Sequence, residues 1–113
     1  MKNLEQIRAK NALEAAPNIK GGEKDGEVVK KIPPMIRDSG ILAAAAFAKE
    51  KGKGYQSVID AIVCHLKCDG IGIMPRNETD FIKWLAEKVD SAKLRAVTEE
   101  TMAYLNYLRR FVR

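Results

Sequence analysis

The chain has 113 residues, of which 46% are hydrophobic and 31% charged, with a formal net charge of +5. This balance excludes a disordered chain, and the length favours one domain, residues 1–113, without a deep substrate cleft. No apolar run approaches the roughly 20 residues that cross a bilayer, and the charged start lacks a signal-peptide core. We therefore expect a cytoplasmic protein with no membrane partner, whose positive charge favours nucleic acid.

Helices are predicted along the whole chain, because apolar residues recur at helical spacing and no segment alternates as a half-buried strand does. Pro33 and Pro34 are expected to kink or divide the second helix, since each removes a backbone donor. The expected helices span residues 3–16, 27–38, 41–51 and 55–67, followed by a fifth capped by Asn77 and a sixth capped by Asp90. The sequence thus predicts an all-α, compact single-domain bundle of about six helices, with flexible loops near residues 18–26 and 69–77.

The final helix, expected to be one rod with Thr98 inside it, carries the most informative pattern. Its cations lie beside a stripe that is predicted to be buried, and no residue among them has obvious catalytic chemistry. This arrangement favours a binding or assembly surface over an active site. At roughly 100° per residue, the buried stripe consists of Leu94, Val97, Thr101, Tyr104, Leu105, Leu108, Phe111 and Val112. The neighbouring stripe holds Arg95, Asn106, Arg109 and Arg113, with Arg110 just beyond it.

The segment from Cys64 to Cys68 comes closest to a metal or catalytic motif. On a helix the two cysteines share a face and His65 lies to one side, but tetrahedral zinc needs four ligands and the chain has no further Cys or His. We therefore predict no metal and no cofactor, with half-buried cysteines and a histidine at the edge. Glu99 and Glu100 are expected to be solvated residues of a first helical turn rather than metal ligands. A metal-dependent or thiol enzyme built on Cys64, His65 and Cys68 is the enzymatic alternative.

Basic residues cluster near the predicted helix ends and along the final helix. The helix dipole accounts for some of them, because it favours cations at carboxyl-terminal ends even without a partner. Trp84, Tyr104 and Phe111 fall on predicted core stripes, and Tyr107 is the aromatic residue that could lie outside them. Base stacking is therefore not indicated, and if nucleic acid is bound, we expect contact with its phosphate backbone. The candidate phosphate contacts are Arg37, Lys49, Lys51, Lys53, Arg95, Arg109, Arg110 and Arg113.

Three segments, in order, resemble a known family. Residues 32–52, IPPMIRDSGILAAAAFAKEKG, are similar to a segment in which a short approach to a Gly–Leu step leads into a helix ending Phe–Lys–Gly. The ending of the chain, residues 98–111, resembles the form aromatic–Leu–x–aromatic–Leu–Arg–Arg–Phe, and residues 4–9 look like the start of the family's first helix. Together they resemble the small subunit of the type III-B CRISPR effector, the Cmr RNA-silencing complex. Residues 64–77 carry no such pattern.

The resemblance implies an all-helical, non-enzymatic subunit without a cofactor. It implies that the protein stacks with further copies of itself beside the backbone subunits of the Cmr complex, where it helps hold guide RNA and target RNA for antiviral defence while other subunits cleave. Arg37, Arg109 and Arg110 lie in the matching segments. The alternative is a stand-alone helical DNA-binding protein, since a basic helix can enter a major groove.

Overall fold

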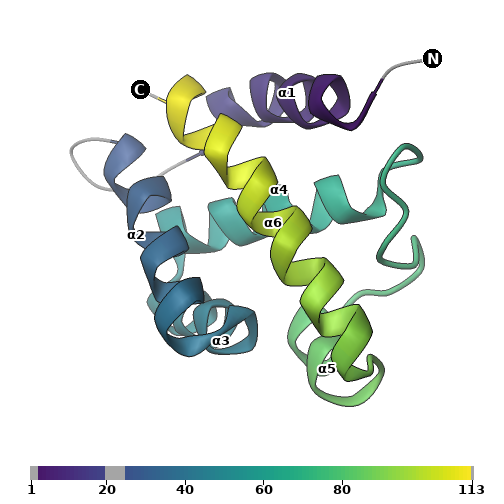
Figure 1. The fold of residues 1–113 in the computed structure, drawn as a ribbon. Coiled ribbons are helices and arrows are strands. Elements are labelled where there is room, and N and C mark those ends of the chain that lie inside the picture. Colours follow the sequence, from purple (N-terminus) through teal and green to yellow (C-terminus); the bar gives the residue numbers. More distant parts are fainter. Residues whose placement is uncertain (1–2, 20–24, 113) are drawn as a thin grey trace.

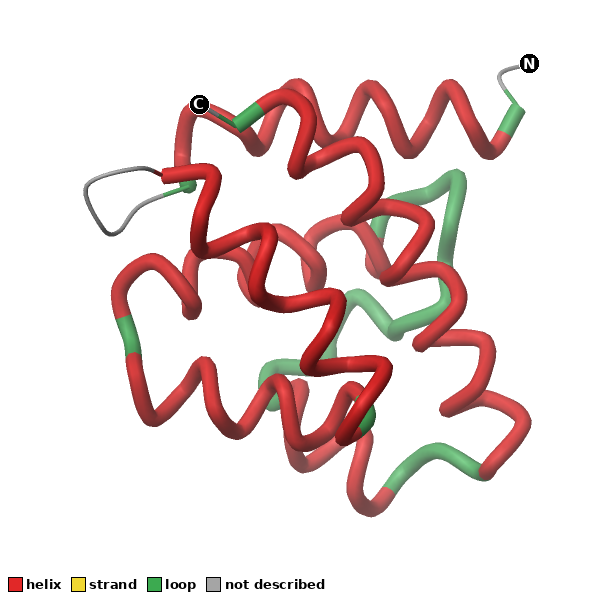
Figure 2. The backbone as a smooth tube through the Cα atoms, turned by 60° about the vertical axis from the view of Figure 1, so that its left-hand side comes forward, coloured by secondary structure: helices red, strands yellow, loops and turns green. Residues whose placement is uncertain are grey.

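The computed structural model describes residues 3–19 and 25–112, and within them every regular element is helical, with no strand (Figure 2). The all-α, single-domain fold predicted from the sequence is confirmed. No helix in these two ranges is both long and apolar enough to cross a membrane. The elements are α1 (Leu4–Ala15), the 3-10 turn η1 (Ala16–Asn18), α2 (Asp25–Ser39), α3 (Ile41–Lys51), α4 (Lys53–Lys67), α5 (Phe81–Glu87) and α6 (Ser91–Phe111).

Helix α6 crosses one face of the molecule and contacts α1, α2 and α4 (Figure 1). Asp90 caps it as predicted, because its carboxylate accepts a hydrogen bond of 2.8 Å from the amide of Lys93. Thr98 lies inside the helix and donates its hydroxyl to the carbonyl of Leu94 at 2.9 Å. The final helix is therefore one rod, as expected.

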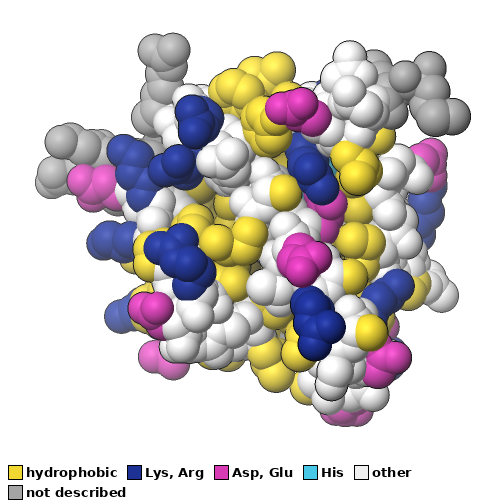
Figure 3. Space-filling model, viewed as in Figure 1, with side chains coloured by type: hydrophobic (Ala, Val, Ile, Leu, Met, Phe, Trp, Pro, Cys, Tyr) yellow, Lys and Arg dark blue, Asp and Glu magenta, His cyan; other side chains and the backbone are white. Residues whose placement is uncertain are grey.

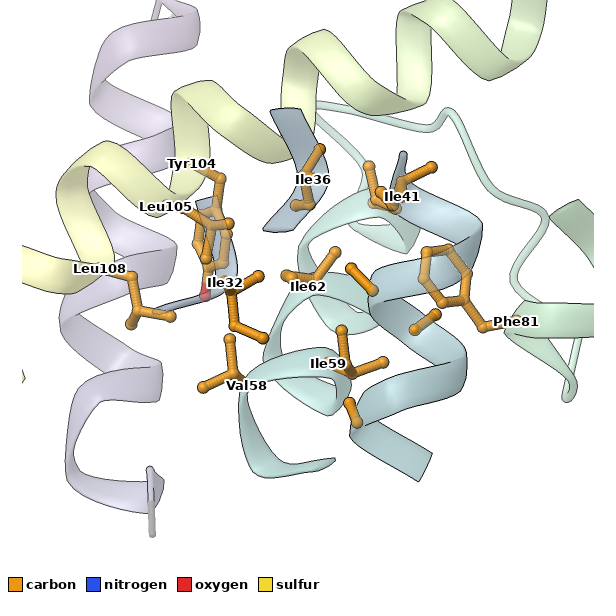
Figure 4. Packing of buried hydrophobic residues seen from close by; sticks show 14 of the residues in the cluster. Ile32, Ile36, Ile41, Val58, Ile59, Ile62, Phe81, Tyr104, Leu105 and Leu108 are labelled. Atoms are coloured by element: carbon orange, nitrogen blue, oxygen red, sulfur yellow. The ribbon is translucent and has the colours of Figure 1, made fainter. Parts of the chain in front are cut away.

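The core lies where α6 meets α2 and α4. Figure 4 shows Tyr104 and Leu108 of α6 gathered with Ile32 of α2 and Val58 of α4. Each of these side chains is at most 1% exposed, and burying an aliphatic side chain of this size contributes roughly 1.5–3 kcal/mol to folding. The predicted stripe of α6 is buried at Val97, Thr101, Tyr104, Leu105 and Leu108, with Leu94 and Phe111 half-buried.

Helix α2 continues through Pro33 and Pro34, so the prolines do not divide it. Each proline lacks an amide hydrogen and leaves the carbonyl four residues earlier without its helical donor, at a cost of about 3 kcal/mol in a helix interior. Val29, Ile32 and Ile36 are buried against α3, α4 and α6. Tertiary packing therefore holds together a helix that its local sequence disfavours.

Helix α5 begins later than predicted, and Asn77 as its cap is wrong. Asp80 performs that role, because its carboxylate accepts the amide of Lys83 at 3.0 Å. Glu78 accepts the amides of Thr79 and Asp80 at 3.1 Å, so a carboxylate shapes the turn that precedes the helix. All four residues from position 77 to 80 are polar, and three of them, Asn77, Thr79 and Asp80, are of types that cap helices, so spacing alone does not choose among them.

The segment between α4 and α5 falls where a loop was predicted, near residues 69–77. It folds back on α4, because the carbonyl of Leu66 accepts the amides of Ile73 and Met74 at 3.0 and 3.1 Å, and Met74 is 2% exposed. Of the other predicted loop, 18–26, residues 20–24 lie outside the described residues. The flexibility of both loops stays a prediction.

Candidate nucleic-acid interface and a buried polar network

Of the eight candidate phosphate contacts, all but Arg113 belong to the described residues, and these seven are exposed. Within residues 3–19 and 25–112, none of them forms an ion pair with a carboxylate. They occupy the end of α2, the junction of α3 with α4, and both ends of α6, at Arg37, Lys49, Lys51, Lys53, Arg95, Arg109 and Arg110. Arg113 lies outside the described residues.

The junction between α3 and α4 gathers three of these cations within five residues. Lys49 and Lys51 lie in the last turn of α3, Gly52 turns the chain with φ of 69°, and Lys53 is the first residue of α4. Gly52 offers α4 no side-chain cap, so the first amides of the helix have no side-chain acceptor from that position. Uncapped amides beside lysines favour an anion such as phosphate.

The cations of α6 form separate groups. Arg95 and Arg109 share one side of the helix but lie 14 residues apart, which is about 21 Å along the axis at 1.5 Å per residue. Arg110 donates its Nε–H to the carbonyl of Asn106 at 3.1 Å, which directs the side chain along the helix. Figure 3 shows Lys and Arg side chains gathered at the left, over α2 and the carboxyl-terminal end of α6, whereas both signs are interspersed at the right.

A second group of charged residues, which sequence reasoning missed, joins α1 to α6. Arg8 of α1 binds Glu100 of α6 with two hydrogen bonds, from Nε to Oε2 at 2.8 Å and from Nη2 to Oε1 at 2.7 Å. The Glu100 side chain is only 8% exposed, and that of Arg8 is 23% exposed. Paired bonds of this kind fix both distance and orientation, so Arg8 holds α1 in register on α6.

His65 of α4 extends this network to a third helix. Its Nε2 lies 2.9 Å from Oε2 of Glu100, and its Nδ1 lies 2.8 Å from Nδ2 of Asn11, which also donates to Sγ of Cys68 at 3.2 Å. An amide nitrogen only donates, so Nδ1 accepts and Nε2 carries the hydrogen that binds Glu100. The Tyr104 ring stacks on the imidazole at a centroid distance of 4.2 Å.

Burial and hydrogen bonding together set the charges in the network. Burial acts to raise the pKa of Glu100, but the bonds from Arg8 and His65 outweigh it and lower the pKa below its ordinary value. Burial lowers the pKa of His65 despite the neighbouring carboxylate. The hydrogen bond to Glu100 raises the pKa of Arg8. The network therefore consists of an ionised pair beside a neutral imidazole.

The prediction of half-buried cysteines with a histidine at the edge is wrong for two of the three residues, because the His65 side chain is fully buried and Cys64 is exposed, whereas Cys68 is half-buried as expected. Both imidazole nitrogens bond to protein groups, and Cys68 bonds to Asn11 rather than to His65. Among the described residues, no three His, Cys, Asp or Glu side chains are grouped to hold a metal ion. The network connects three helices, and its charged groups and both imidazole nitrogens have hydrogen-bond partners within it.

Glu100 is also not in a first helical turn, because α6 begins at Ser91. One sequence signal did mark it. Glu100 lies three residues after Val97 and four before Tyr104, so it shares the stripe predicted to be buried. A carboxylate on such a stripe needs a partner, but its partners lie 35 and 92 residues away along the chain, where spacing gives no guidance.

A small all-α domain with an internally satisfied polar junction and exposed, unpaired cations has the features of a helical binding or assembly subunit. The model of the family described as CRISPR-associated protein (Cas_Cmr5) matches residues 4–113. The chain therefore belongs to this family, the small subunits of type III-B CRISPR (Cmr) complexes, and the resemblance seen in the sequence is confirmed. Membership implies association with other Cmr subunits and does not favour a stand-alone DNA-binding protein. No curated protein and no solved structure gives a significant match.

Proposed function

We propose that this chain is a non-catalytic structural subunit that helps hold guide RNA and target RNA, and that further copies of it stack along the backbone subunits of the Cmr complex. Membership of the family over residues 4–113 supports the assembly. The observation that carries the RNA contact is that seven exposed candidate cations have no carboxylate partner among the described residues. Phosphate would supply the missing negative charge.

Two of these cations stand where the helix dipole does not favour them. Lys53 opens α4, and Arg95 lies in the amino-terminal part of α6, near the positive ends of the two dipoles. Lys53 also has a φ of 45°, in a region that a residue with a Cβ rarely adopts. Both the position of Lys53 in the helix dipole and its backbone conformation are unfavourable. This suggests that Lys53 serves binding rather than folding. Binding of phosphate is the role that fits a lysine.

The contact is to the RNA backbone, since the large aromatic residues serve the fold. Trp84 is 4% exposed and Tyr104 1% exposed, so neither ring offers a face to a base. Tyr107 donates its hydroxyl to Glu5 at 2.5 Å and so helps join α6 to α1. RNA held through phosphates can have any sequence, as guides that differ from one another require.

Stacking of copies is supported by the outer side of α3. Ala43 and Ala46 are exposed there, while Ala44, Ala45 and Ala48 pack inward. Small side chains on a helix surface let a neighbouring helix approach closely. Replacing Ala43 with Glu should reduce the number of copies in the reconstituted complex, measured by native mass spectrometry, without changing the melting temperature of the isolated chain.

The experiment that tests the proposed function is purification of the tagged protein from its own cells, with identification of the proteins and RNA recovered. Larger Cmr subunits together with guide RNAs that share a repeat-derived tag are the expected result. Recovery of the protein alone, under conditions that keep large complexes intact, would contradict it.

The lysines of the α3–α4 junction can be tested in the reconstituted complex. Replacing Lys49, Lys51 and Lys53 with Gln should flatten the plot of log affinity for RNA against log salt by about one unit for each phosphate that is no longer neutralised. Lys83 on α5 is an exposed lysine outside the candidate set, so Lys83→Gln is the matched control. Equal slopes for the triple variant and the control would remove these lysines from the RNA contact.

A further inference from the structure

A groove of about 950 Å³ runs between α1 and α4, next to the lysine junction. The small side chains of Ala15 on α1 and Ala61 on α4 leave the groove wide. The stacked rings of His65 and Tyr104 lie beneath the groove. Its volume is near the upper end of the roughly 300–1,000 Å³ in which proteins hold small ligands. There is room for the base and sugar of a nucleotide.

Among the described residues that line this groove, only two charges pair with each other. Lys10 pairs with Glu14 at 3.2 Å, and Asp60 accepts a hydrogen bond of 2.9 Å from the amide of Gln56. Lys53, at one end, is the cation without a carboxylate partner within the described residues. The carboxylate of Asp60 keeps its negative charge, because Gln56 is neutral. The interior of the groove therefore favours an uncharged group with N–H edges over a further anion, while phosphate is favoured at the Lys53 end.

Two amide oxygens stand on opposite walls of the groove. Asn11 uses its NH₂ group for His65 and Cys68, and Gln56 uses its own for Asp60. Each side chain thus keeps its carbonyl oxygen, and in residues 3–19 and 25–112 neither oxygen accepts a hydrogen bond. Side-chain oxygens of this kind match the exocyclic amino groups of adenine, cytosine and guanine, whose two N–H bonds can serve two acceptors, whereas an unpaired uracil offers only one edge donor, its N3–H.

The groove is continuous with the proposed RNA contact, because Lys53 belongs to both. We propose that the α1–α4 groove receives one unpaired nucleobase of the RNA whose phosphates contact Lys49, Lys51 and Lys53, with adenine, cytosine or guanine preferred over uracil. This inference rests on the proposed function and adds to it a contact with a base. The base lies between the two helices, held by its edge, while its phosphate stays at the rim.

Cys64 provides a reporter inside the groove, because it is exposed and lines the wall formed by α4. In a Cys68→Ser background, whose hydroxyl can still accept the hydrogen bond from Asn11, the rate of Cys64 alkylation by N-ethylmaleimide is measured in three assemblies. These are the chain with its partner subunits alone, with guide RNA, and with guide plus target RNA. Addition of RNA should slow the alkylation at least about tenfold, as expected for a reagent that competes with a bound group.

The matched control moves the thiol to α5. Ala86 is exposed and does not line the groove, so a chain with Cys64→Ser, Cys68→Ser and Ala86→Cys should be alkylated at the same rate with and without RNA. Protection of Cys64 by the partner subunits alone would show that a protein fills the groove and would overturn the proposal. Unchanged Cys64 alkylation in the RNA-loaded complex would overturn it as well.

Separate experiments test the preference among bases and the occupancy of the groove by a base. Target RNAs with cytidines mismatched to the guide should protect Cys64 about three- to tenfold better than RNAs with uridines at the same mismatched positions, the size of one or two hydrogen bonds. Ala61→Phe, which fills the groove, should weaken RNA binding about tenfold without lowering the melting temperature. Equal protection by both RNAs would overturn the base preference, and unchanged affinity of the Ala61→Phe complex would overturn occupancy of the groove.

Failure of this inference can be distinguished from failure of the proposed function. If Lys49→Gln, Lys51→Gln and Lys53→Gln reduce RNA binding while Cys64 stays reactive in the RNA-loaded complex, the groove is empty and the phosphate contact stands. If the complex binds no RNA through this subunit at all, replacement of the three lysines and replacement of Arg109 and Arg110 both leave the salt dependence unchanged, and the proposed function itself is wrong.

Discussion

The two ends of α4 use charge in opposite ways. At its carboxyl-terminal end His65 meets Glu100 and Arg8, and each charged group has a hydrogen-bonded partner inside the protein. At its amino-terminal end Lys53 stands with Lys49, exposed and without a carboxylate within the described part of the chain. Helix α4 therefore connects a network whose charges are paired within the protein to a surface whose lysines have no carboxylate partner among the described residues.

The energetic consequence is that residues of the same type should behave differently at the two places. Removing Glu100 leaves the partly buried Arg8 without the acceptor of its two hydrogen bonds, whereas an exposed ion pair contributes only about 0–1 kcal/mol. Stability measurements should thus respond to the network, and RNA measurements to the lysines. The predictions that follow test this separation, beginning with the largest effect.

Replacing Glu100 with Ala should lower the free energy of unfolding by about 3 kcal/mol, because Arg8 and His65 then lose their common acceptor in a buried setting. For a domain of this size the melting temperature should fall by more than about 10 °C, as circular dichroism would show. Glu87→Ala, an exposed carboxylate on α5, is the control and should leave the melting temperature nearly unchanged. Equal effects of the two substitutions would mean that the network does not stabilise the fold.

Acidification should weaken the same junction in two steps. Burial lowers the pKa of His65 below its ordinary 6.5, so below that pH the unfolded chain takes up a proton that the folded chain does not, and stability falls. The pKa of Glu100 is lowered below 4.5, so its contribution is lost at still lower pH. Urea unfolding at a series of pH values should show both losses.

His65→Gln separates the two steps. Glutamine cannot take up a proton in this range, so the variant should lack the loss of stability that begins near pH 6.5 and keep the loss that begins below pH 4.5. Parallel curves for the variant and the natural chain would show that His65 does not cause the first loss.

Thr101 provides a smaller contrast within the core. Its side chain is fully buried, and its hydroxyl has no hydrogen-bond partner in the part of the chain that the structure describes. A buried hydroxyl without a partner is unfavourable, so Thr101→Val, which keeps the shape, should raise the free energy of unfolding by about 1 kcal/mol. A loss of stability in urea titration would show that this hydroxyl has a partner.

The sequence predicted those parts of the fold that depend on neighbouring residues. The apolar stripe of α6 and its cap at Asp90 were correct, because helical spacing and capping act within a few residues. The cap of α5 was wrong, since Asn77, Thr79 and Asp80 all suit a cap and the packing of Phe81 and Trp84 helps decide among them. Local chemistry thus predicts that a helix forms more reliably than where it begins.

The same distinction between local and long-range effects applies to the candidate site. Exposure of Lys49, Lys51 and Lys53 could be predicted from their place at a helix end. The bond between Arg8 and Glu100 could not, because it spans 92 residues and depends on how α1 lies across α6. A charge on an apolar stripe signals that a partner exists, and the fold alone identifies the partner.

The smallest effect on stability is expected at the end of α6. Arg109 and Arg110 are exposed, so replacing both with Gln should leave the melting temperature unchanged. The same change should flatten the salt dependence of RNA binding by the complex, by about one unit of slope for each phosphate that these arginines neutralise. Lys88→Gln is the matched control, because Lys88 is exposed but already paired with Glu78 at 2.9 Å. If Lys88→Gln changes the slope as much as the arginine pair does, an unpaired cation has no advantage over a paired one. The difference between paired and unpaired charges at the two ends of α4 would then affect the stability of the fold but not the binding of RNA.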